Sequence, residues 1–281
     1  MFKYHHGTST GELDRIQWKA GLSLVSYGVR IGIRVSESNI LEQLQDYLPP
    51  GWEEFPSLDV DELYSLVVSK SPDGYQLYRG QEELLQSLDL EDIFETLDSD
   101  LRLRVGTLVE DRLFVHAGVV GWLGRVIAIP GRSFSGKTTL VEALTKAGAT
   151  YYSDEYAVFD PDGLVYPYPR RLSIRRGGDK WVRRSVEDFG GKVGTKPLPL
   201  GLVVQTQYQP KAVWCPQEMS LGEAVLALLD NTIVARTRPE FALPILSRAV
   251  SGARAFEGKR GEAEDVAGAI LRQGDFLRTQ S

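Results

Sequence analysis

The sequence is poor in the residues that mark secreted and metal-binding proteins. It has one cysteine, Cys215, and three histidines among 281 residues. A single cysteine excludes an internal disulfide framework and suits a reducing compartment, so we expect a cytoplasmic protein. The first residues lack the apolar stretch of a signal peptide, and no apolar run reaches the length of a membrane span. We therefore expect no membrane partner.

Charge and composition exclude further classes. The formal net charge is −6 at pH 7, which argues against a general nucleic-acid binder. Hydrophobic residues make up 42% of the chain and charged residues 25%, as in a soluble globular protein with an ample core. No internal repeat or low-complexity tract is present.

The first 88 residues predict a small α+β module without a catalytic signature. Strands are expected at 21–35, which could equally be a hairpin, at 61–69 and at 75–79. A short helix capped by Ser36 or Ser38 is expected to run to Leu48. We place the domain boundary near Leu88, which gives a module at 1–88 and a larger domain at 89–281. An amphipathic helix carrying Ile93, Leu97, Leu101 and Val105 opens that second domain.

The strongest motif is G-x-x-x-x-G-K-T at residues 131–138. The apolar run 126–129 before it predicts a buried strand, and Leu140, Val141 and Leu144 after it recur at helical spacing. A strand leading in and a helix leading out are the context in which this motif forms a phosphate-binding P-loop. Glycines let successive backbone N–H groups turn toward a phosphate chain, where the new helix also presents its unpaired N–H groups. The sequence therefore predicts binding of a nucleoside triphosphate or a close polyphosphate relative.

Two P-loop side chains have individual roles. Lys137 can reach the β- and γ-phosphates as a point charge, and the Thr138 hydroxyl can hold Mg²⁺. The expected nucleotide-binding residues are Gly131, Arg132, Ser133, Phe134, Ser135, Gly136, Lys137, Thr138 and Thr139.

A second group of candidates follows the P-loop helix. Residues 150–153 predict a strand that ends in the carboxylates Asp154 and Glu155. Carboxylates at the carboxyl end of a strand beside a P-loop strand lie where an α/β nucleotide site needs them. One can coordinate Mg²⁺, and the other can accept a proton from an attacking hydroxyl. An ordinary turn is the plain alternative.

Seven basic residues and one acid lie between positions 170 and 184. They are Arg170, Arg171, Arg175, Arg176, Lys180, Arg183 and Arg184, with Asp179. Such a cluster is often only a solvated face. Close to a phosphotransfer site it could equally be a mobile loop that holds phosphate or an acidic acceptor segment. Arg175 is the best single candidate, because an arginine fork stabilises a migrating phosphoryl group.

The remainder of the chain predicts strands and helices that support the site and carry no catalytic motif. A strand is expected at 202–205, a helix with a Ser220–Glu223 capping box up to about residue 229, a helix at 239–250, a short strand at 252–257 and a last helix at 262–272. Arg248 and Arg254 could contact a nucleotide, although surface placement explains them as well.

These motifs together resemble the catalytic domain of HPr kinase/phosphorylase and its wider group of HPr-kinase-like proteins. The matching segments are His116-Ala-Gly-Val-Val, Gly131 with Gly136-Lys137-Thr138, the helix end Lys-Ala-Gly, Tyr-Ser-Asp154-Glu155 and Ile174-Arg175-Arg-Gly177. The resemblance implies an α/β fold, shared with phosphoenolpyruvate carboxykinases, in which a P-loop is inserted in a compact mixed sheet flanked by helices. It also implies a homo-oligomer.

The resemblance further implies catalytic roles. Asp154 matches the family's acid/base, Glu155 stands where a second aspartate helps to hold metal, and His116 matches the active-site histidine. Two departures indicate a diverged relative. The family's glutamate before Ile-Arg-Gly is Ser173 here, and the run that marks the bifunctional enzymes is absent after Gly177. We therefore transfer no phosphorylase activity.

The leading hypothesis is an ATP- and Mg²⁺-dependent kinase that transfers the γ-phosphoryl group to a hydroxyl. The acceptor would be a serine of a protein or peptide, or a small hydroxylated molecule. Asp154 would take the hydroxyl proton, Lys137 and the loop amides would hold the phosphates, and Thr138 and Glu155, with Asp154, would hold Mg²⁺. The competing hypothesis is a nucleotide-gated regulatory or assembly protein that only senses or slowly hydrolyses ATP. A carboxykinase is disfavoured, because no manganese-binding set of His, Lys and Asp is evident.

Overall fold

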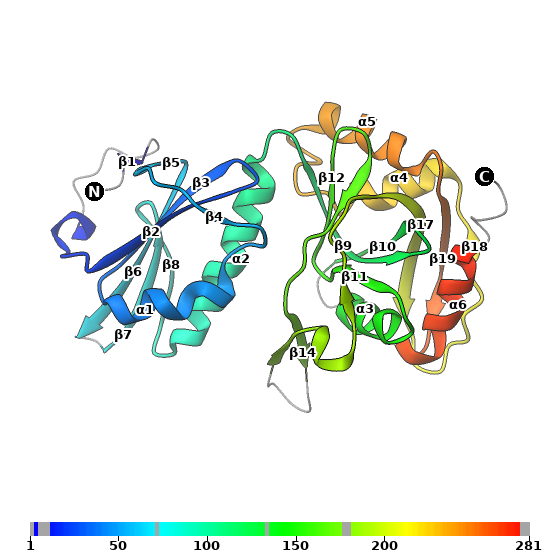
Figure 1. Ribbon diagram of the computed structural model, residues 1–281, viewed down its shortest axis with the longest axis horizontal. Helices are drawn as coiled ribbons and strands as arrows, with labels where there is room; N and C mark the ends of the chain where they lie inside the picture. Colours follow the sequence, from blue (N-terminus) through cyan, green and yellow to red (C-terminus); the bar gives the residue numbers. More distant parts are fainter. Residues whose placement is uncertain (1–2, 5–11, 71–72, 133–134, 176–180, 276–281) are drawn as a thin grey trace. The chain divides into compact units, whose positions relative to one another are not determined.

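The computed structural model of the chain describes residues 3–4, 12–70, 73–132, 135–175 and 181–275. The chain folds into two compact units, Met1–Glu110 and Asp111–Ser281 (Figure 1). Each unit builds its own mixed sheet, in which parallel and antiparallel neighbours both occur. A mixed α/β architecture is therefore confirmed. No helix within the described ranges has the length and apolar content needed to cross a bilayer.

The first unit is built on a sheet whose strands lie in the order β4-β2-β3-β6-β7-β8. These strands are β2 (Ala20–Ser26), β3 (Val29–Val35), β4 (Glu53–Glu54), β6 (Glu62–Lys70), β7 (Asp73–Arg79) and β8 (Glu82–Ser87). A short parallel pair, β1 (Lys3–Tyr4) and β5 (Asp59–Val60), and a 3-10 turn at Glu12–Arg15 lie outside this order. Residues 21–35 form the hairpin β2–β3, and β6 and β7 confirm the strands expected at 61–69 and 75–79.

Helix α1 (Ser38–Gln43) and the 3-10 turn Leu44–Tyr47 follow β3. The N-cap of α1 is Glu37, which makes no side-chain capping bond, so the expected cap at Ser36 or Ser38 is wrong. The Ser36 hydroxyl instead accepts a hydrogen bond from the backbone N–H of Val68 at 2.8 Å. A serine hydroxyl that accepts this hydrogen bond from β6 does not cap the helix.

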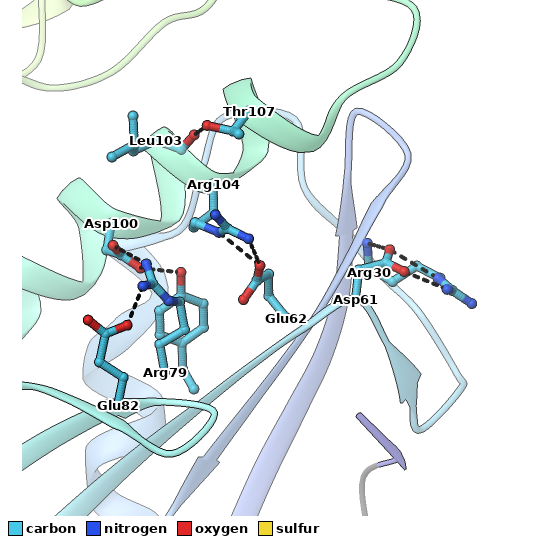
Figure 2. Close-up of polar contacts among 10 residues, drawn as sticks. Arg30, Asp61, Glu62, Arg79, Glu82, Asp100, Leu103, Arg104 and Thr107 are labelled. Atoms are coloured by element: carbon cyan, nitrogen blue, oxygen red, sulfur yellow. Dashed lines mark hydrogen bonds and ion pairs between the residues drawn. The ribbon is translucent and has the colours of Figure 1, made fainter. Parts of the chain in front are cut away.

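Helix α2 (Leu90–Leu108) closes the first unit. It buries Ile93, Leu97, Leu101 and Val105 on one face, as the sequence predicted. Its polar residues also reach the sheet of this unit, as Figure 2 shows: Arg104 pairs with Glu62 of β6, and Asp100 accepts from Arg79 of β7. The structural division therefore falls after α2, at residues 110 and 111, rather than near Leu88 as expected.

The second unit is built on a larger sheet with the strand order β16-β11-β9-β12-β13-β17-β19-β18, and β10 pairs with both β9 and β17. The strands are β9 (Leu113–Trp122), β10 (Arg125–Pro130), β11 (Thr150–Ser153), β12 (Tyr156–Phe159), β13 (Leu164–Tyr166), β16 (Lys192–Val193), β17 (Leu198–Tyr208), β18 (Gln217–Glu218) and β19 (Arg254–Arg260). Because β10, β17 and β19 run parallel, their carboxyl ends meet at one edge of the sheet.

Helices cover both faces of this sheet (Figure 1). They are α3 (Lys137–Lys146), α4 (Leu221–Leu229), α5 (Pro239–Val250) and α6 (Ala263–Asp275). One apolar cluster joins the sheet to α4 and α5, and another joins it to α3 and α6. The predicted capping box is present, because Ser220 and Glu223 each satisfy the backbone N–H of the other. The expected mixed sheet flanked by helices is confirmed for this unit.

Two segments differ from their predictions. The basic segment, which could equally have been a solvated face or a mobile loop, contains an antiparallel pair, β14 (Leu172–Arg175) and β15 (Trp181–Arg184). A 3-10 turn at Glu187–Phe189 follows. The strand expected at 202–205 runs from Leu198 to Tyr208 and includes Pro199.

Candidate functional site

The glycine-rich loop, residues 131–136, joins the end of β10 to the start of α3. Gly136 adopts a φ of 82°, a left-handed conformation that glycine alone reaches without strain. Gly118 of β9 lets α3 lie close to the sheet, since a Cβ there would lie 2.6 Å from Cγ2 of Val141. The predicted strand–loop–helix is thus present, and a glycine at each of these two positions permits it.

Lys137 is the first residue of α3 and only 7% exposed. Its Nζ donates a hydrogen bond to the backbone oxygen of Arg132 at 2.7 Å, across the loop. Burial lowers the pKa of Lys137 to about 8, although the carboxylates of Glu155 and Asp154 act in the opposite direction. A cation that is desolvated at a helix N-terminus attracts anions strongly.

Asp154 follows β11 and lies beside the start of α3. One carboxylate oxygen accepts from the Thr138 hydroxyl at 3.0 Å, and the other accepts from the Tyr151 hydroxyl at 2.9 Å. The residue is 6% exposed, and burial raises its pKa to about 6, while both hydroxyl bonds act to lower it and Glu155 acts to raise it. Its titration therefore falls close to neutral pH, where a general base is effective.

The turn after β11 is fixed by Ser153. Its hydroxyl accepts hydrogen bonds from the backbone N–H groups of Glu155 at 3.1 Å and of Tyr156 at 2.9 Å. The backbone oxygen of Glu155 accepts in turn from Ala117 of β9 at 3.0 Å. These bonds fix the backbone that carries Glu155 against the neighbouring strand.

Glu155 lies between two basic side chains. His116 Nε2 is 3.5 Å from one of its carboxylate oxygens, and Arg170 Nη1 is 4.0 Å from the other. All three side chains are partly exposed. The structure thus places His116 and, from the basic cluster, Arg170 beside Glu155.

Two residues at this site escaped the sequence analysis. Tyr151 is fully buried on β11, and its hydroxyl contacts Asp154 as well as the backbone oxygen of Arg170, at 3.0 Å. Arg260, the last residue of β19, donates from Nη2 to the backbone oxygen of Gly136 at 3.0 Å. The motif's own spacing signals neither residue, although an aromatic residue inside a strand that ends in Asp-Glu was a hint of the first.

The other candidates fall into three groups. Gly131 and Ser135 lie in the glycine-rich loop, where the Arg132 backbone oxygen accepts from the Ser135 N–H, and Thr139 is exposed on α3. Arg175 lies on β14, but its side chain, like Ser133, Phe134, Arg176 and Lys180, is outside the described part of the structure. Arg254 pairs with Glu218, and Arg248 donates to the Pro161 backbone, so neither is bonded to the loop.

The residues present fit a magnesium ion in their chemistry. The Thr138 hydroxyl and the carboxylates of Asp154 and Glu155 are hard oxygen donors, and Mg²⁺ in nucleotide sites is held by one or two such groups together with phosphate and water. Within the described ranges, no group of three or more His, Cys, Asp or Glu side chains is placed to hold a metal by itself.

The chain matches no protein-family model, and no curated protein matches it. A solved structure of the Hpr(Ser) kinase/phosphatase from Coxiella burnetii is similar to it with a TM-score of 0.35 and 15% sequence identity. That similarity covers 60% of this chain and 99% of the other. At these values the similarity carries no argument about activity, which has to rest on the geometry of the site.

Proposed function

We propose that this protein is an ATP- and Mg²⁺-dependent phosphotransferase that moves the γ-phosphoryl group to a hydroxyl. The observation that carries the proposal is the 3.0 Å hydrogen bond between Thr138 and Asp154. It places a buried carboxylate directly beside the first turn of α3, next to Lys137. A carboxylate and a lysine at a glycine-rich helix start are two of the groups that recur in sites of phosphoryl transfer.

Each residue has a defined task in this proposal. The loop amides and Lys137 bind the β- and γ-phosphates, and the helix start adds its own N–H groups. Asp154, with a pKa of about 6, accepts the proton of the attacking hydroxyl. When bound between Thr138, Glu155 and Asp154, Mg²⁺ would supply charge neutralisation for the phosphates. His116 and the Glu155 carboxylate form the partly exposed side, where an acceptor can approach.

We prefer a serine of a protein or peptide as the acceptor, with a small hydroxylated molecule as the near variant. Arg170 lies next to Glu155, and the same basic segment continues into β15 with Arg183 and Arg184. Such residues would favour an acidic acceptor segment. Arg175 would be the arginine that stabilises the migrating phosphoryl group.

One observation favours a second candidate, a regulatory or assembly ATPase. Both carboxylate oxygens of Asp154 are already engaged by hydroxyl groups, and the side chain is 6% exposed. That arrangement also suits a carboxylate that only orients the Thr138 hydroxyl beside a metal ion. Such a protein would bind and slowly hydrolyse ATP without an acceptor.

A transfer assay separates the two candidates. The purified chain is incubated with γ-labelled ATP, Mg²⁺ and a cell lysate, and the products are separated by size. A kinase labels a macromolecule or a small metabolite, and the Asp154→Asn variant does not. Release of inorganic phosphate alone supports the ATPase, and the absence of both products contradicts the proposal.

A further inference from the structure

Arg260 is a buried cation that touches the glycine-rich loop from outside the motif. It is 3% exposed and lies at the end of β19. Its Nη2 donates to the backbone oxygen of Gly136 at 3.0 Å, and its Nη1 donates to the backbone oxygen of Gly261 at 3.0 Å. The contact between Arg260 and Gly136 joins residues 124 positions apart in the chain.

This guanidinium donates its hydrogen bonds to backbone oxygens. Among the described residues, Arg260 forms no ion pair, and its buried Nε has no hydrogen-bond partner. The Tyr208 ring lies 5.5 Å from the guanidinium carbon. Burial lowers the pKa of Arg260 below its ordinary value, although the carboxylates of Glu262 and Glu264 act in the opposite direction. A buried charge bonded to neutral groups alone destabilises a fold, so a role in ligand binding is a natural reason for it.

The bond to Gly136 acts on one particular peptide group. The Gly136 oxygen also accepts the first helical bond of α3, from the Leu140 N–H at 3.1 Å. In a trans peptide, the oxygen of residue 136 and the N–H of residue 137 point in opposite directions. Holding that oxygen therefore directs the Lys137 N–H outward from the helix start. A donor on the oxygen also polarises the same N–H, because hydrogen bonds in a chain strengthen one another.

We propose that Arg260 is a positioning residue for polyphosphate binding, acting through the Gly136–Lys137 peptide. The inference rests on the proposed function, because the ligand it serves is the phosphate chain of a nucleoside triphosphate. Arg260 fixes the orientation of the loop's last peptide and adds positive potential at the helix start. The nucleoside part of the ligand plays no part in this effect.

The test compares the phosphate chain with the whole nucleotide. The affinity of the full-length protein for MgATP and for inorganic triphosphate with Mg²⁺ is measured by calorimetry, in the wild type and in Arg260→Met. We expect Arg260→Met to lower the affinity for both ligands by the same factor, roughly tenfold or more. Arg260→Lys keeps the charge and part of the donor set, and it restores part of the affinity. Arg254→Met is the matched control on the same strand and leaves both affinities unchanged.

The outcomes are distinct. If the wild type binds both ligands and Arg260→Met binds them equally well, this inference is wrong while the proposed function stands. A loss confined to ATP places Arg260 at the nucleoside and also overturns the inference. A wild type that binds neither ligand overturns the proposed function itself. Should Arg260→Met fail to fold, Arg260→Lys decides, because an unchanged affinity for triphosphate in that variant contradicts a role for the guanidinium fork.

Discussion

The two units of the chain hold their buried charges in different ways. In the first unit, opposite charges meet: Glu62 with Arg104, Asp98 with Arg102 and Asp100 with Arg79. In the second unit, Lys137, Asp154 and Arg260 are bonded to hydroxyl groups and backbone oxygens. None of these three forms an ion pair with another described residue.

The difference separates charges that stabilise a fold from charges that are kept for a ligand. A buried ion pair satisfies both partners, and removing one of them leaves the other uncompensated. A buried charge with neutral partners already carries that penalty in the folded state. Perturbed charges of this kind gather at functional sites, and in this chain they gather around the glycine-rich loop.

Removing the carboxylate of Asp154 should give the largest effect. We expect Asp154→Asn to reduce phosphoryl transfer by about 10³-fold, because the variant lacks the group that accepts the hydroxyl proton. The affinity for ADP should stay within about twofold, since Lys137 and the loop remain. Transfer rate and ADP affinity are measured side by side, with Asp162→Asn on the exposed β12–β13 turn as the control. Turnover that survives in Asp154→Asn would show that Asp154 is not the base.

Breaking a pair in the first unit should reduce stability. Arg104→Met leaves the buried Glu62 carboxylate without its cation, and we expect the free energy of unfolding to fall by about 3 kcal/mol. The change is measured by urea unfolding. Glu82→Gln is the control, because Glu82 is exposed and its pair with Arg79 should contribute less than about 1 kcal/mol. If the free energy of unfolding falls equally little in both variants, the buried ion pairs do not stabilise the first unit.

Replacing Asp154 by a neutral residue should raise the free energy of unfolding, the opposite of the effect expected for Arg104→Met. The folded-state pKa of Asp154 lies above its ordinary value of 3.8, so the ionised carboxylate destabilises the fold above about pH 6. We expect Asp154→Asn to be more stable than the wild type by about 2 kcal/mol at pH 8, and the gain to vanish as the pH falls to about 4. Urea unfolding at the two pH values measures this. A variant that is less stable at pH 8 would contradict the comparison between the units.

The pH dependence of kcat/KM should show the smallest effect. Activity is expected to fall below about pH 6, where Asp154 becomes protonated, and above about pH 8, where Lys137 loses its charge. Each limb should approach a tenfold change per pH unit. The acid limb is absent from the profile if Asp154 does not act as the base, and the alkaline limb is absent if Lys137 does not bind phosphate as a cation.

Local patterns predicted much of the fold. The apolar run before Gly131, the helical spacing after Lys137 and the Ser220–Glu223 capping box each depend on a few neighbouring residues, and the structure has the corresponding elements. The sequence placed Asp154 at the end of a strand beside the P-loop strand. In the structure β9 lies between β10 and β11, and Asp154 contacts Thr138 at 3.0 Å.

The errors concern interactions between distant parts of the chain. Helix α2 has one apolar face, but the ion pairs that assign it to the first unit depend on residues such as Glu62 and Arg79 of that sheet. Arg260 reaches Gly136 only because β19 runs parallel to β17 and ends beside the loop. Spacing along the sequence contains neither relationship.

Tyr151 has a consequence for the basic hairpin of β14 and β15. Its phenol carries one hydrogen but lies within bonding distance of two acceptors, the Asp154 carboxylate at 2.9 Å and the Arg170 backbone oxygen at 3.0 Å. An ionised aspartate holds that hydrogen more strongly than a carbonyl does, whereas a protonated one releases it. Protonation of Asp154 therefore strengthens the hydrogen bond from Tyr151 to the Arg170 backbone, just before β14 begins.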